Sequence, residues 1–158
     1  MARHNNKLLV DLSAIESHQA STTEETNKAI IQLLDYCTTY PDDGILYRAS
    51  GMILAGHSDA GFNNETKARS RAGAHIFLSG NEAISRWNGP VLTIEKIMKY
   101  VVSLTAEVDM TTLFLTEKEM VSLRHTLTEM GRKQPPSPVQ LDKSTAAGMT
   151  NCTLIPRK

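Results

Sequence analysis

Three aspartate residues fall at positions that a fold could bring together. Asp59 and Asp142 are each expected at the end of a strand, and Asp109 is expected in the first turn of a long helix. Carboxylates that converge repel one another unless cations hold them. A pair of divalent ions roughly 4 Å apart is the usual solution, and such a pair activates a water molecule for attack on a phosphodiester. The three residues therefore indicate a candidate site for Mg²⁺, or Mn²⁺, and for hydrolysis of a nucleic-acid backbone.

Helix geometry separates Asp109 from a second acidic residue nearby. At about 100° per residue, Asp109 falls within the apolar arc of the helix that contains Leu113 and Met120. Glu107 falls roughly 160° away from Asp109, beyond the edge of that arc. We therefore expect Asp109 to face the interior and Glu107 to lean towards solvent, which makes Glu107 the weaker candidate as a metal ligand.

Each aspartate also has a simple structural explanation. An Asp at the end of a strand commonly caps a turn. An acidic residue in the first turn of a helix commonly complements the helix dipole. Spacing alone leaves both the metal site and these structural roles open.

The elements that would position these residues form an alternation of strands and helices. We expect a three-stranded antiparallel meander, a polar loop within it, a long helix with Gly131 as its C-cap, and one further short strand. The expected ranges are strands at 52–58, 72–78, 83–87 and 139–141, a loop at 63–71, a turn at 88–90, the long helix at 105–130 and a possible short helix at 145–151. Helices that cover a sheet give an α/β layer fold.

The first part of the chain is expected to be helical. Apolar spacing predicts a helix at 8–19, and Thr22 with Glu25 fits a capping box before a second helix that Pro41 ends. Residues 45–50 read as a strand.

Length, composition and net charge limit the classes of protein to which the chain can belong. The chain has 158 residues, 41% of them apolar, and a formal net charge of zero, so a real core is possible and a strongly basic nucleic-acid binder is not indicated. The start of the chain lacks the apolar core of a signal peptide, and no apolar run is long enough to span a membrane. We expect an intracellular protein, cytoplasmic or nuclear and not secreted, with Cys37 and Cys152 as free thiols.

Other residues with chemical potential carry weaker signals. Lys67, Arg69 and Arg71 could contact phosphates, although a solvated surface loop is the more common explanation for such residues. His57 and His75 read as ordinary sheet residues. No phosphate-binding loop, paired-cysteine motif or nucleophile elbow occurs, so no small-molecule cofactor is expected.

The segments around the three aspartates resemble the reverse transcriptase to ribonuclease H junction of copia-type retrotransposon polyproteins. The most telling is His57-Ser58-Asp59-Ala60-Gly61-Phe62. The other matching segments are 40–45, 47–50, 64–75, 86–94, 118–120, 129–131, 134–140, Asp142 and 144–146. The resemblance runs from about Lys7 through nearly the whole chain, and the number of ordered matches makes it specific.

The resemblance implies a reverse transcriptase connection or tail segment at 1–43 and a ribonuclease H-like domain at 44–158, incomplete at its C-terminal end. It also implies cleavage of the RNA strand of RNA–DNA hybrids by two Mg²⁺ ions held by four acidic residues. Asp59 matches the first of these residues and Asp142 the third. Asp109 stands where the family has a Glu, and Lys143 follows Asp142 where the family usually has Asn. The last strand, the closing helix and the fourth acidic residue of the family have no match.

Two hypotheses follow from this resemblance and its departures. The first is a residual Mg²⁺-dependent nuclease that uses Asp59, Asp109 and Asp142. The second, which we favour for the isolated chain, is a non-catalytic relic or domesticated module that interacts with proteins or nucleic acids. A third possibility is a chain that completes its fold with a partner, such as the remaining segments of the polyprotein.

Overall fold

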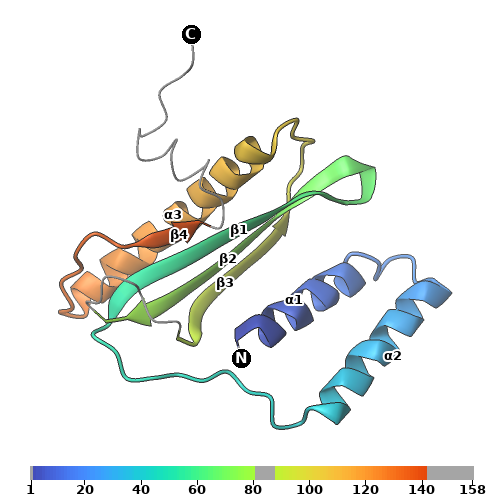
Figure 1. Ribbon diagram of the computed structural model, residues 1–158, viewed down its shortest axis with the longest axis horizontal. Helices are drawn as coiled ribbons and strands as arrows, with labels where there is room; N and C mark the ends of the chain where they lie inside the picture. The colour runs from blue at the N-terminus through green and yellow to red at the C-terminus, as the bar shows by residue number, and fades with distance from the viewer. Residues whose placement is uncertain (1, 81–87, 142–158) are drawn as a thin grey trace. The chain divides into compact units, whose positions relative to one another are not determined.

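The computed structural model describes residues 2–80 and 88–141, and the chain divides into two compact units, Met1–Tyr47 and Arg48–Lys158. The second unit is an α/β layer structure with a mixed, open, four-stranded sheet (Figure 1). Within the described residues, no helix is long and apolar enough to cross a membrane.

The first unit contains two helices, α1 at Ala2–Glu16 and α2 at Glu24–Thr39. The capping box of α2 is shifted by one residue from the expected Thr22 and Glu25. Thr23 is the N-cap, its hydroxyl accepts the Thr26 backbone N–H at 3.2 Å, and the Thr26 hydroxyl accepts the Thr23 backbone N–H at 3.4 Å. Two adjacent threonines make either one a plausible N-cap in the sequence, and backbone geometry selects the second.

The sheet has the order β3-β2-β1-β4. Its strands are β1 at Ile53–Glu65, β2 at Arg69–Ser79, β3 at Pro90–Ile97 and β4 at Val139–Leu141. The pairs β1–β2 and β2–β3 are antiparallel, and β4 lies parallel to β1 on its other edge. The expected antiparallel meander and the short strand at 139–141 are thus present.

Two expectations about this region are wrong. Residues 63–71 are not a loop, because β1 continues to Glu65 and β2 begins at Arg69, with only a short 3₁₀ turn, Thr66–Ala68, between them. Pro90 does not close the meander but begins β3, since proline is tolerated at the first residue of an edge strand. The expected third strand at 83–87 and the short helix at 145–151 lie outside the described residues.

The expected strand at 45–50 is also wrong. This segment has no strand pairing, and its apolar side chains are largely exposed: 47% for Ile45, 52% for Leu46 and 63% for Tyr47. Apolar residues favour a strand only where a neighbouring strand and a core can receive them.

Helix α3, at Thr105–Glu129, packs along one face of the sheet, as Figure 1 shows, and agrees with the expected range 105–130. Its end has the expected glycine. Gly131 adopts φ +80°, and the N–H groups of Gly131 and Arg132 donate to the carbonyls of Thr128 and Leu127 at 2.9 Å each. This is the Schellman arrangement, which satisfies carbonyls that a helix end leaves open.

Two apolar clusters join α3 to the sheet. One contains Leu54, Ile76, Met120 and Leu127, and the other contains Ala72, Met98, Val102 and Val108. The two clusters hold opposite ends of α3, so α3 runs antiparallel to β1 and is fixed along its length.

Candidate acidic site on the sheet

Gly56 identifies the side of β1 that faces α3. A Cβ atom added there would lie 3.0 Å from the Met120 sulfur and 3.6 Å from Cγ2 of Thr116. Side chains alternate along a strand, and the pairing of β1 with β2 is regular from Ile53 to Gly61. Ser58 therefore shares the α3 side, and the side chain of Asp59 points to the opposite side.

Asp59 lies in the middle of β1, opposite Gly73 of β2, and not at the end of a strand as expected. Its side chain is exposed, and its Oδ1 accepts the backbone N–H of Ala60 at 2.8 Å. On the other edge of β1, the parallel pairing with β4 ends where Ser58 faces Leu141. Asp59 and Asp142 are the next residues of the two segments in the sequence, and Asp142 lies outside the described residues.

Asp109 lies just beyond the first turn of α3 and is only 8% exposed. Glu107, two residues earlier, is exposed. Both orientations expected from helix geometry are confirmed. Burying a carboxylate is costly unless donors or cations compensate, so Asp109 occupies a position where a hydrophobic side chain would be the ordinary choice.

Asp109 belongs to a polar seam on the sheet side of α3. Between Val108 of one apolar cluster and Met120 of the other, α3 places Asp109, Thr112 and Thr116 against the sheet, and the two threonines are 1% and 0% exposed. Their hydroxyls each donate to the carbonyl four residues earlier at 2.8 Å.

From β1, Ser58 adds a hydroxyl that is 2% exposed and has no hydrogen-bond partner within residues 2–80 and 88–141. The α3–β1 interface therefore carries these polar groups, together with the buried Leu113, between the two apolar clusters. Of the polar seam, the sequence indicated only Asp109 as a residue that could do chemistry.

The described part of the chain does not place Asp59 and Asp109 on one side of β1. Within it, no group of three or more His, Cys, Asp and Glu side chains is arranged to hold a metal ion. Chemically, the carboxylate oxygens of both residues suit a hard cation such as Mg²⁺.

The side of the sheet away from α3 carries two carboxylates, Asp59 and Glu95, that the sequence did not relate to each other. Asp59, Gly73 and Glu95 are direct neighbours across β1, β2 and β3. Glu95 does not act as a free carboxylate, because Arg71 of β2 contacts both Glu95 and Glu65. Pairing register, and not sequence spacing, brings these residues together.

Arg71 is the central cation of this group. It is 6% exposed, its Nε lies 2.6 Å from Oε1 of Glu65, and its Nη1 donates to Oε1 of Glu95. Burial alone would lower the pKa of Arg71, but the hydrogen bonds and charges of Glu65 and Glu95 outweigh burial, and the pKa is raised. The guanidinium is thus held by two carboxylates on the sheet and is not presented to a phosphate.

The other two basic candidates lie at the tip of the β1–β2 hairpin. Lys67 is exposed, and Arg69 is half-buried with its Nε donating to the Thr66 carbonyl at 3.2 Å. Only these two of the three residues expected to contact nucleic acid lie at the hairpin tip.

The hairpin tip contains an unfavourable backbone conformation. Lys67 has φ 63° and ψ 34°, and Ala68 has φ 52°, which is the left-handed region that Gly and Asn tolerate best. Replacing Ala68 by Gly should raise the free energy of unfolding by about 0.5–1 kcal/mol, since relief of strain exceeds the added freedom of the unfolded chain. Urea denaturation measures the change. The matched control is Ala60→Gly in regular β1, which should lower stability; a loss of stability in Ala68→Gly would contradict the strained turn.

His75 behaves as the expected sheet residue. It is 4% exposed, and its Nε2 donates to the carbonyl of Asn88 at 3.0 Å. Burial lowers its pKa, the hydrogen bond to Asn88 opposes this, and the nearby His57 lowers it further. The ring is therefore neutral at physiological pH.

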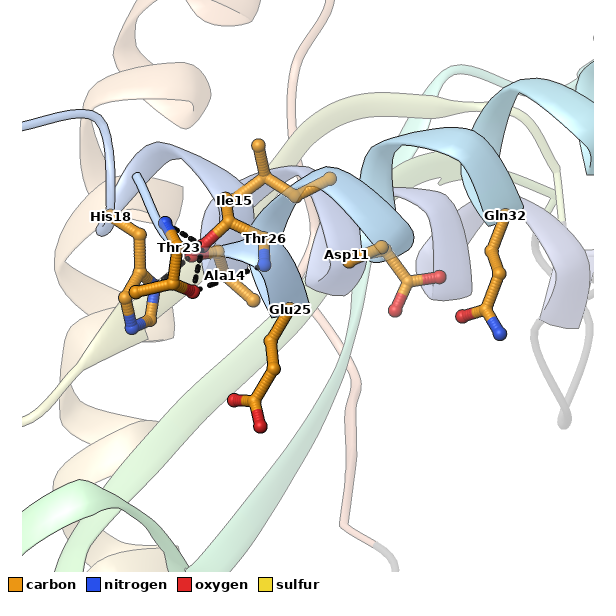
Figure 2. A pocket seen from close by; sticks show the side chains of 9 residues that line it. Asp11, Ala14, Ile15, His18, Thr23, Glu25, Thr26 and Gln32 are labelled. Atoms are coloured by element: carbon orange, nitrogen blue, oxygen red, sulfur yellow. Dashed lines mark hydrogen bonds between the residues drawn. The ribbon is translucent and has the colours of Figure 1, made fainter. Parts of the chain in front are cut away.

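A pocket of about 260 Å³ lies in the first unit, between α1 and α2 (Figure 2). Asp11, Ile15 and His18 line it from the α1 side, and Thr23 and Thr26 line it with their capping hydrogen bonds. The two threonine hydroxyls serve the start of α2, and the pocket contains none of the residues expected to do chemistry.

No protein-family model, no curated protein and no solved structure matches the chain.

Proposed function

We propose that this chain is a retrotransposon-derived, ribonuclease H-like protein whose ancestral activity is hydrolysis of RNA in RNA–DNA hybrids, and that its own activity is weak or lost. The observation that carries the proposal is the burial of Asp109 on the sheet side of α3. That is where the resemblance to copia-type polyproteins requires the second metal ligand. A carboxylate buried at a helix–sheet interface is more typical of a functional position than of a structural one.

The arrangement of the second unit supports the same proposal. The second unit has an antiparallel meander, a helix packed on it and a following strand parallel to the first strand. This is the arrangement expected of a ribonuclease H-like fold. The first strand carries Asp59, and the following strand ends directly before Asp142 in the sequence.

In such a site Mg²⁺ or Mn²⁺ would be held by Asp59, Asp109 and Asp142, with Glu107 a weaker candidate. The ions would supply an activated water and stabilise the leaving oxygen of the scissile phosphodiester. Lys67 and Arg69 at the hairpin tip would contact the phosphate backbone of the hybrid, and such contacts give no sequence specificity.

Two observations favour weak activity or the alternative, a non-catalytic relic or interaction module. Asp109 is one methylene shorter than the Glu of the family, and ligand geometry at metal sites must be held within about 0.5 Å. The side chain of Asp59 points away from the layer that contains Asp109. Asp59 and Asp109 could hold the same two metal ions only if their carboxylates met around β1.

Incubation of the full chain with a labelled RNA–DNA hybrid and Mg²⁺ or Mn²⁺ tests the proposal. We expect slow cleavage that falls to background in Asp59→Asn and in Asp109→Asn, while Glu107→Gln, with its exposed side chain, retains it. No cleavage by a well-folded chain, or cleavage that persists in both Asp→Asn variants, would reject the nuclease and leave the non-catalytic module.

A further inference from the structure

Helix α3 exposes apolar side chains on the face that points away from the sheet. Phe114 is 65% exposed, Val121 is 53% exposed and Met110 is 36% exposed. At about 100° per residue, these three lie within roughly 40° of one another around the helix. A helix in a layered domain normally carries polar residues there, so this stripe is typical of an interaction surface.

The stripe is flanked by opposite charges. Glu107 and Lys118 are both exposed, and eleven residues of helix put them only about 20° apart, on the same flank of the stripe. This flank therefore has an acidic residue near the Met110 end of the stripe and a basic residue near the Val121 end.

We propose that this face of α3 is a homodimer interface, with α3 of a second copy packed antiparallel along it. In a two-fold symmetric antiparallel pair, each flank of one helix meets the same flank of the other. A two-fold axis at the level of Thr112 and Leu113 places Phe114 of the second copy at the level of Thr111, beside Met110 on the stripe.

The same axis places Glu107 opposite Lys118, and symmetry forms each contact twice. The two copies of Phe114 then lie on either side of the axis, about 4.5 Å apart along the helix direction. Charge complementarity and apolar contact thus agree on one alignment, which is the reason to favour a second copy over an unrelated helix.

The stripe contains few side chains, so the dimer should be weak. Stable dimers bury at least about 1,200 Å² in total, and a single helix pair falls at or below that limit. We expect a dissociation constant on the order of 10–100 µM, with the monomer dominant in dilute solution.

Analytical ultracentrifugation of the full chain across a concentration series tests the dimer and its alignment. Wild type should shift from monomer to dimer. Glu107→Lys and Lys118→Glu should each weaken association about tenfold, because each places like charges opposite each other. The double variant should return the dissociation constant to within about threefold of wild type. Phe114→Ser should abolish association.

Glu119→Lys is the matched control, because Glu119 is exposed on α3 but lies off the stripe; it should associate as wild type does. Circular dichroism establishes that every variant is folded. A wild-type chain that stays monomeric throughout the series, single charge variants that associate normally, or a double variant that fails to recover would each overturn the proposal.

Discussion

Replacing Arg71 by Met should lower the free energy of unfolding by about 3–5 kcal/mol at neutral pH. The side chains of Arg71, Glu65 and Glu95 are only 7%, 18% and 12% exposed. The group holds one guanidinium and two carboxylates, so removing the cation leaves two negative charges in a partly desolvated space. The loss comes mainly from those uncompensated charges, and not from the number of hydrogen bonds removed.

The pH dependence of this loss follows from the same charges. The folded-state pKa of Arg71 is raised, so the guanidinium contributes its stability at all pH values below its unfolded pKa and loses it only at extreme alkalinity. The deficit of Arg71→Met relative to wild type should therefore stay the same from neutral pH into the alkaline range.

Two variants separate charge loss from general disruption at this hairpin. Arg69→Met removes a neighbouring arginine that, within residues 2–80 and 88–141, donates to Thr66, and it should cost less than about 1 kcal/mol. Glu95→Gln keeps the side-chain size and leaves Arg71 paired with Glu65, and its cost should also be small. Urea denaturation at several pH values measures all three. If the free energy of unfolding of Arg71→Met lay within about 1 kcal/mol of wild type, loss of the cation would not leave Glu65 and Glu95 as uncompensated buried charges.

The spacing of the apolar residues and the glycine at the helix end were sufficient to predict α3 and the orientation of its acidic residues. The three-four spacing from Leu113 to Leu127 sets the helix, Gly131 ends it in a Schellman arrangement, and Asp109 then faces the sheet. These are local properties, since each depends on residues within a few turns of one another.

Strand boundaries were harder to predict because they depend on pairing. Residues 45–50 include an apolar run but pair with no strand in the described part of the chain, whereas 63–65 and 69–71 are polar and still extend the hairpin. Because Pro90 is typical of a turn, β3 was not expected there. Its residues Leu92, Thr93 and Ile94 nevertheless alternate between apolar and polar side chains, as in a strand.

The candidate site shows the same division between local and long-range information. Helix phase identified Asp109, but the side of β1 that Asp59 faces depends on the register with β2 and on the packing of Gly56 against α3. The contacts of Arg71 with Glu65 and Glu95 depend on register across three strands. A one-residue shift in any of those pairings would reverse which carboxylates share a side.

Truncating Leu54 to Ala should lower the free energy of unfolding by about 2–5 kcal/mol. Leu54 is 0% exposed and packs with Ile76, Met120 and Leu127, so the variant leaves a cavity between β1 and the C-terminal half of α3. Because Leu54 is fully buried, we expect the cost at the upper part of this range.

The matched control for Leu54→Ala is Leu104→Ala, which removes the same atoms from a side chain that is 66% exposed. In dilute solution it should cost less than about 0.5 kcal/mol. Hydrogen exchange gives a second readout: in Leu54→Ala the amides of α3 should lose protection together with those of β1, because one cluster joins them. If protection fell in β1 alone while α3 kept its wild-type exchange rates, the apolar cluster would not be what holds the helix to the sheet.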